Sequence, residues 1–172
     1  WRARRSRRVA TRGATDRVIR AEDRQDRRGR RALTQEIRAQ PGPQEQALSS
    51  DADIVILGGS AGGGKSYAIL LTIAQHVHIP TFGAVVFRRT HPQLTETGSI
   101  WPKSFELFQH LRATPNLGEL RWVFPSGATA RFRHMEHASD RYNYDGAQIP
   151  FMAFDELQSF EEEQFWYMVS RS

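Results

Sequence analysis

The sequence predicts an α/β fold, with a mainly parallel sheet and helices on both of its faces. Three observations predict it. The apolar run 54–57 is typical of a buried strand, a glycine-rich loop follows it, and apolar residues then recur with helical spacing over 65–77. A second apolar run, 84–87, supplies the next strand. Strand, loop, helix and strand in this order form a right-handed crossover unit, and such units build parallel sheets.

The glycine-rich loop carries the clearest motif of the chain. It fits G-x-x-x-x-G-K-[ST] over the residues Gly59, Ser60, Ala61, Gly62, Gly63, Gly64, Lys65 and Ser66. Glycines allow successive backbone N–H groups to turn towards a phosphate, and the N-terminus of the following helix adds a positive dipole. Lys65 is expected to neutralise the terminal phosphates, and Ser66 to place its hydroxyl on Mg²⁺. The loop therefore predicts binding of a nucleoside triphosphate.

The remaining elements follow from hydrophobic spacing and turn residues. Pro-Gly and Pro-Ser-Gly sequences mark the breaks between them. The sequence predicts a helix over 101–111, an inserted hairpin of 121–124 and 129–133, a third strand over 149–154 and a closing helix over 161–169.

Two carboxylates, Asp155 and Glu156, follow the third predicted strand. Pleating sends neighbouring side chains to different sides, so Asp155 is expected to reach Mg²⁺ while Glu156 orients and deprotonates an attacking water. A divalent ion would relieve the repulsion between the two acids. Because a carboxylate beside the metal ligand suits the activation of water, ATP hydrolysis is favoured over the chemistry of a kinase or small GTPase.

Charge divides the chain at about residue 40. Residues 1–40 hold 14 arginines and five acids, whereas the other 132 residues hold 10 basic and 14 acidic groups. An arginine-dense segment with few apolar residues is expected to be disordered. It could bind nucleic-acid phosphates, or it could be a solvated tail. It could also lie outside the natural product, because the chain opens on Trp1 and its first methionine is Met135. The expected domain, 41–172, is an incomplete P-loop ATPase domain.

Composition excludes several other classes. The chain has no cysteine, so disulfides and thiolate zinc sites are excluded, and no apolar run reaches the length of a membrane span. A cytoplasmic protein without membrane contact is expected. The histidine pairs His76/His78 and His134/His137 lack the acids or cysteines that would complete a metal site, so packing or surface positions are expected for them.

Taken together, the loop, the acid pair and the segments 87–90, 122–128 and 146–151 resemble the ATPase domain of the large terminase subunit of tailed bacteriophages and prophages. The similarity runs from about residue 42 to residue 171. It implies a RecA-like (ASCE) P-loop NTPase that uses ATP and Mg²⁺ to translocate double-stranded viral DNA into a capsid in the host cytoplasm. The family further implies a homo-oligomeric ring, the portal protein and the small terminase subunit as partners, and a coupling motif and nuclease domain beyond this segment.

The resemblance also implies roles for single residues. By position, Lys65 and Ser66 match the phosphate and Mg²⁺ residues, Asp155 the second Mg²⁺ partner and Glu156 the catalytic carboxylate. Gln44 or Gln46 is similar to the glutamine that reads adenine.

One departure from the family concerns arginine. Many terminases carry an arginine early in the loop, where this chain has Ser60 and Ala61. Arg141 is therefore expected to act as a finger on a neighbouring subunit's nucleotide; Arg88, Arg89 and Arg133 are the alternatives.

Two other functions stay open at this point. A helicase-like P-loop translocase shares the upstream glutamine, the glycine loop and the acid pair. A non-catalytic nucleic-acid-binding protein would act through the arginine-rich tail instead.

Overall fold

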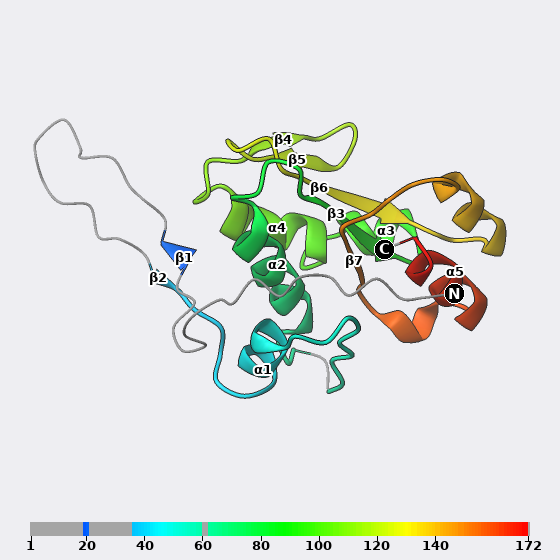
Figure 1. Cartoon of the computed structure of the whole chain (residues 1–172), viewed down its shortest axis with the longest axis horizontal. Coiled ribbons are helices and arrows are strands. Elements are labelled where there is room, and N and C mark those ends of the chain that lie inside the picture. Colours follow the sequence, from blue (N-terminus) through cyan, green and yellow to red (C-terminus); the bar gives the residue numbers. More distant parts are fainter. Residues whose placement is uncertain (1–18, 21–35, 60–61, 172) are drawn as a thin grey trace, which may run out of the picture.

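A five-stranded sheet forms the centre of the structure, and helices lie against both of its faces (Figure 1). The computed structural model describes residues 19–20, 36–59 and 62–171. The strands run in the spatial order β4-β5-β6-β3-β7. Their bounds are β3 Gly83–Arg88, β4 Thr114–Asn116, β5 Arg121–Val123, β6 Thr129–His134 and β7 Phe151–Phe154. The helices are α1 Pro43–Ser49, α2 Lys65–His76, α3 His91–Thr95, α4 Ile100–Phe108 and α5 Glu162–Val169, with 3₁₀ turns η1 Ala138–Tyr144 and η2 Leu157–Ser159.

The sheet is parallel at one end and antiparallel at the other. Strand β3 pairs in parallel with β6 and with β7, so Val86 lies opposite both Phe132 and Ala153. Strand β5 pairs antiparallel with β6, which confirms the predicted hairpin, and β4 adds a further antiparallel strand. The α/β class is therefore confirmed, whereas a RecA-like parallel core is not.

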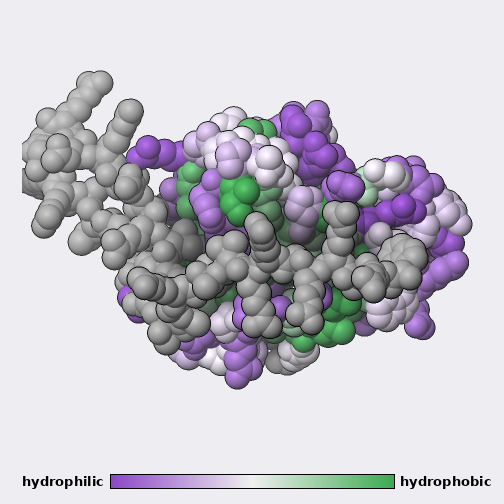
Figure 2. All heavy atoms as spheres, in the orientation of Figure 1, coloured by the Kyte–Doolittle hydropathy of each residue, from purple (hydrophilic) through white to green (hydrophobic). Residues whose placement is uncertain are grey.

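Alternation along β3 supplies two cores. Ala84 and Val86 face a larger core that contains apolar residues of α2 and α4 and the buried Trp122. Val85 and Phe87 face a smaller core that includes Met168 of α5. Helices thus cover both faces, as predicted. In Figure 2 hydrophilic residues dominate the visible surface over η1 and α5, at the right of the view, since α5 turns its acidic residues outwards.

Local signals explain where several helices begin. Helix α2 follows Gly64, whose φ of 73° is the left-handed conformation that glycine adopts without strain. Helix α3 begins with a capping box in which Thr90 Oγ1 accepts from the backbone N–H of Gln93. Helix α5 begins with a capping box between Glu161 and Gln164. The helices predicted over 65–77, 101–111 and 161–169 are confirmed by α2, α4 and α5.

The strand predicted over 54–57 is wrong. The segment has no regular secondary structure, and Ile54, Val55 and Ile56 are 43%, 46% and 70% exposed. Strand β7, at the edge of the sheet, pairs only with β3 among the strands that the structure describes. An apolar run becomes a strand by fitting a paired, half-buried surface, and within the described part of the chain 54–57 pairs with no strand. The crossover unit predicted from this run is therefore not formed, and a RecA-like core is not confirmed.

Only part of the predicted tail is described. Strand β1, Ile19–Arg20, pairs antiparallel with β2, Glu36–Ile37. Ile37 is buried in the larger core and Ala39 packs against it, so packing begins a few residues before the predicted boundary at residue 41. Residues 1–18 and 21–35, on which most of the disorder prediction falls, lie outside the described residues. Within the described ranges, no helix combines the length and the apolar character that crossing a membrane requires.

Candidate functional site

The carboxyl ends of β3 and β7 bring two charged side chains together. Arg88 is the last residue of β3, and Asp155 follows β7 directly. The backbone N–H of Asp155 donates to the carbonyl of Phe87 at 2.9 Å, which extends the parallel pairing by one residue. Neighbouring parallel strands therefore fix the position of the Asp155 carboxylate, as the apolar run before it predicted.

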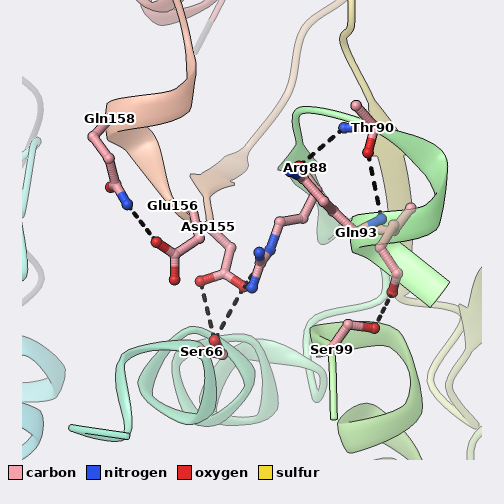
Figure 3. Close-up of polar contacts among 9 residues, drawn as sticks. Ser66, Arg88, Thr90, Gln93, Ser99, Asp155, Glu156 and Gln158 are labelled. Carbon is pink, nitrogen blue, oxygen red and sulfur yellow. Dashed lines mark hydrogen bonds and ion pairs between the residues drawn. The ribbon is translucent and has the colours of Figure 1, made fainter. Parts of the chain in front are cut away.

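Asp155 lies between Arg88 and the start of α2 (Figure 3). The Arg88 Nε and Nη2 atoms lie 2.8 and 2.7 Å from Asp155 Oδ2. Ser66 Oγ, in the first turn of α2, lies 3.0 Å from each of the two carboxylate oxygens. The Asp155 side chain is only 1% exposed, so the guanidinium and the hydroxyl replace the water that a carboxylate would otherwise bind. The two predicted metal-binding residues, 89 positions apart, are thus in direct contact.

Helix α1 contacts the end of the glycine loop through Gln44. The buried Gln44 donates from Nε2 to the carbonyl of Gly64 at 2.9 Å and accepts from the backbone N–H of Gln40 at 2.9 Å. A Cβ on Gly64 would lie 2.1 Å from Gln44 Nε2, so this approach requires glycine. Both ends of the Gln44 amide are therefore used by the protein, while Gln46 is exposed. Which glutamine reads adenine stays a prediction.

The loop itself is described in part. Gly59 and Gly62 have φ of 128° and 83°, values that favour glycine, and Lys65 Nζ donates to the Gly59 carbonyl at 3.0 Å. Ser60 and Ala61, which were predicted to contact the nucleotide, lie outside the described residues. Lys65 therefore contacts the loop whose bound phosphates it was predicted to neutralise.

Glu156 sits beside Asp155 but turns to a different partner. Its φ of 61° places a non-glycine residue in the left-handed region, and its carboxylate accepts from Gln158 Nε2 of η2. Figure 3 shows Asp155 directed at Ser66 and Arg88, and Glu156 directed at Gln158. The neighbouring acids therefore face different partners, but the left-handed turn at Glu156, beyond the end of β7, causes this and strand pleating does not. Left-handed backbone at a non-glycine residue concentrates at functional positions, which is consistent with a special role for Glu156.

Arg141, the predicted finger, lies elsewhere in the structure. It belongs to η1, is 8% exposed, and its Nη2 atom lies 2.8 Å from Glu163 Oε1 and 3.0 Å from the Tyr142 hydroxyl. Its guanidinium also lies over the Tyr142 and Tyr167 rings, 4.8 and 5.6 Å from their centroids. These contacts join η1 to α5, and the residue is not among the contacts of Ser66 and Asp155. Its role as a finger stays a prediction.

Sequence reasoning missed the part that Arg88 plays. It placed Arg88 among the alternatives for a finger, whereas the structure pairs it with the buried acid of its own chain. The neighbouring Arg89 turns away and contacts Gln164 and Glu161 of the α5 capping box. The sequence places each charge at or just after a strand end, but only the strand order shows that these two ends are neighbours.

The predicted metal site has the donor chemistry that a hard cation requires. Asp155 and Ser66 offer oxygen atoms, which Mg²⁺ prefers, and Mg²⁺ takes only one or two carboxylates when phosphates and waters complete its shell. No group of three or more His, Cys, Asp or Glu residues capable of holding a metal occurs in the described part of the chain. The residues present therefore fit a cation that arrives with a nucleotide.

The fold and the site define an α/β protein in which a glycine loop and its helix meet a carboxylate at the end of a parallel strand. The family model described as "Terminase large subunit, T4likevirus-type, N-terminal" matches residues 56–172. The chain therefore belongs to this family, which confirms the resemblance found in the sequence and supports a role in the packaging of phage DNA. Comparison with curated proteins gave no match, and comparison with solved structures gave none either.

Proposed function

We propose that this chain is the ATP-hydrolysing part of a terminase large subunit, a motor that translocates double-stranded viral DNA into the capsid. One observation carries the proposal: the serine of the glycine loop and the acid that ends β7 are in hydrogen-bond contact. The family match favours a terminase over a helicase-like translocase. A RecA-like arrangement, a ring of subunits, and contacts with the portal protein and the small subunit belong to this proposal.

Each residue of the site has one task in the proposed reaction. The loop backbone and Lys65 bind the phosphates, with the N-terminal dipole of α2 behind them. Ser66 and Asp155 hold the divalent cation, which offsets charge on the transferring phosphoryl group when it is bound. Glu156 orients the attacking water and accepts its proton.

The test separates binding from hydrolysis. Binding of a fluorescent ATP analogue to the full chain is measured with Mg²⁺, and ATP hydrolysis is measured with duplex DNA present. Lys65→Ala is expected to lose binding, while Glu156→Gln keeps binding and loses hydrolysis by roughly a hundredfold or more, as loss of a general base does. Lys103→Ala, on α4, is the control. A wild-type chain that binds no nucleotide contradicts the proposal.

The same preparation distinguishes a packaging motor from a helicase. A terminase moves along intact duplex DNA, so hydrolysis should respond to duplex DNA without separation of its strands. Strand separation by the wild-type protein would favour the helicase-like alternative.

A further inference from the structure

Arg88 makes an unusual pair of contacts with the predicted metal ligand. Both of its donors, Nε and Nη2, converge on Asp155 Oδ2, at 2.8 and 2.7 Å. Ser66 Oγ lies 3.0 Å from both carboxylate oxygens, whereas both Arg88 contacts go to Oδ2. Arg88 thereby holds Oδ2 and keeps the carboxylate in contact with the loop serine.

The charges of the site balance in this arrangement. Lys65 and Arg88 carry two positive charges, and Asp155 and Glu156 carry two negative charges. Without Arg88, a carboxylate that is 1% exposed would stand uncompensated beside a triphosphate of several negative charges. Like charges a few ångströms apart in a buried site repel strongly.

We propose that Arg88 is a positioning residue, which orients and neutralises Asp155 so that the loop can hold a triphosphate even before its divalent cation is in place. This inference rests on the proposed function. It assigns Arg88 a role within its own subunit, in place of a finger directed at a neighbour. Arg88 acts through Asp155 and not by touching the nucleotide.

The experiment compares nucleotide affinity with and without magnesium. Binding of a fluorescent ATP analogue to the full chain is measured in EDTA and in excess Mg²⁺ for the wild type, Arg88→Gln and Arg89→Gln. Arg88→Gln is expected to lose roughly tenfold or more in EDTA, as loss of a charge-assisted contact does, but much less in Mg²⁺, because the cation then supplies the missing charge. The ratio of the affinity in Mg²⁺ to the affinity in EDTA should therefore be larger for Arg88→Gln than for the wild type.

Arg89→Gln is the matched control. It removes the neighbouring arginine, which contacts Gln164 and Glu161 and not Asp155. The ratio of its affinities in the two conditions should equal that of the wild type. Equal losses for Arg88→Gln with and without magnesium would indicate a purely structural role and overturn the inference.

A double-mutant cycle tests whether Arg88 acts through Asp155. In an Asp155→Asn background no uncompensated carboxylate remains, so adding Arg88→Gln should cause no loss specific to EDTA. A loss that persists in that background would mean that Arg88 binds the phosphates itself, and would overturn the positioning role.

Stability in the absence of nucleotide supplies an independent readout. Arg88→Gln leaves a buried carboxylate without its counter-charge and is expected to lower Tm by roughly 5–10 °C, and Asp155→Asn should restore part of the loss. Should Arg88→Gln fail to fold, Arg88→Lys keeps the charge but not the two-donor contact. For Arg88→Lys, the ratio of nucleotide affinities with and without Mg²⁺ should be close to that of the wild type, while kcat is lower. A loss of affinity in EDTA as large as that expected for Arg88→Gln contradicts the inference.

These measurements also separate the inference from the proposed function. A wild-type chain that binds no nucleotide overturns both. A wild type that binds nucleotide, with an Arg88→Gln variant of unchanged magnesium dependence, overturns the inference alone.

Discussion

Ser66 Oγ lies 3.0 Å from both carboxylate oxygens of Asp155, so one hydroxyl proton joins the start of α2 to the end of β7. The first prediction follows from this contact. Ser66→Ala removes the only side-chain oxygen that the loop helix offers to a cation here, and affinity for ATP in Mg²⁺ should fall roughly tenfold, the equivalent of about 1.4 kcal/mol. Titration with a fluorescent ATP analogue measures the loss.

The matched control for that titration is Ser170→Ala. This serine is exposed, and its hydroxyl donates to the Tyr167 carbonyl at 2.6 Å, away from the site. Equal affinities for the wild type and Ser66→Ala would contradict a metal-binding role for Ser66.

The second prediction concerns the approach of Gln44 to Gly64. Gly64→Ala places a Cβ in the amide of Gln44 and forces a left-handed φ on alanine, so it should destabilise the chain by about 2–4 kcal/mol. Gly98→Ala is the control, because Gly98 has φ of 83° and open space around its Cβ position, so strain alone should cost about 1–2 kcal/mol. Urea unfolding measures both.

A further variant isolates the clash. In a Gln44→Ala background, Gly64→Ala should cost about as much as Gly98→Ala does. If Gly64→Ala costs no more than Gly98→Ala in the wild-type background, the Gln44 amide moves aside at little cost and its contact with Gly64 contributes little to stability.

The third prediction concerns a buried polar group in the larger core. Trp122 Nε1 donates to Ser104 Oγ at 2.8 Å, and the Ser104 hydroxyl donates to the Trp101 carbonyl at 2.6 Å. Ser104→Ala leaves the buried indole N–H without its acceptor and should cost about 1–3 kcal/mol of stability. Denaturant unfolding followed by tryptophan fluorescence measures it. In a Trp122→Phe background, which lacks the indole donor, Ser104→Ala should cost less, and an unchanged cost would indicate a cavity effect instead.

The fourth prediction concerns alkaline pH. Burial raises the pKa of Tyr144, whose ring meets Phe87 edge-on at a centroid distance of 5.2 Å. A raised pKa means that the folded chain holds this proton more tightly than the unfolded chain. The stabilisation is therefore complete below the ordinary tyrosine value of about 10 and is lost as pH rises through the folded-state pKa.

Tyr144→Phe tests this sign. The variant should match the wild type at pH 7 and lose less stability between about pH 9 and pH 11, as measured by chemical unfolding at each pH. If Tyr144→Phe loses more stability than the wild type over this pH range, the predicted direction of the Tyr144 contribution is wrong.

The fifth prediction distinguishes two roles of Arg141. Its contacts with Glu163, Tyr142 and Tyr167 predict that Arg141→Ala loosens η1 from α5 and lowers Tm. A finger predicts instead that DNA-stimulated hydrolysis by assembled subunits is lost while nucleotide binding persists. Thermal unfolding and turnover of the same variant decide between the two, and an unchanged turnover removes the finger.

Sequence alone predicted the ends of β3 and β7, because a continuous apolar run indicates a buried strand and the charged residue after it indicates where that strand ends. It also placed α2, α4, α5 and the β5–β6 hairpin, whose hydrophobic periods and turn residues are local signals. Asp155 and Ser66 could be assigned to one site because their motif context is specific.

The errors have a common physical origin. The pairing of Arg88 with Asp155 depends on which strands are neighbours, and strand order is not a local property. The run 54–57 has the composition of a buried strand, but composition does not supply the partner that pairing requires. The packing of Ile37 against the larger core was missed because only a few apolar residues interrupt the charged segment around it.

The ionic contact at the ends of β3 and β7 has a consequence for how the protein matures. Since a guanidinium of the same chain already compensates the buried acid, a newly synthesised subunit needs no cofactor to complete this edge of its sheet. Under the proposed function, folding and nucleotide loading can therefore be separate events in time, and the purified chain should survive dialysis against a chelator with its tertiary structure intact.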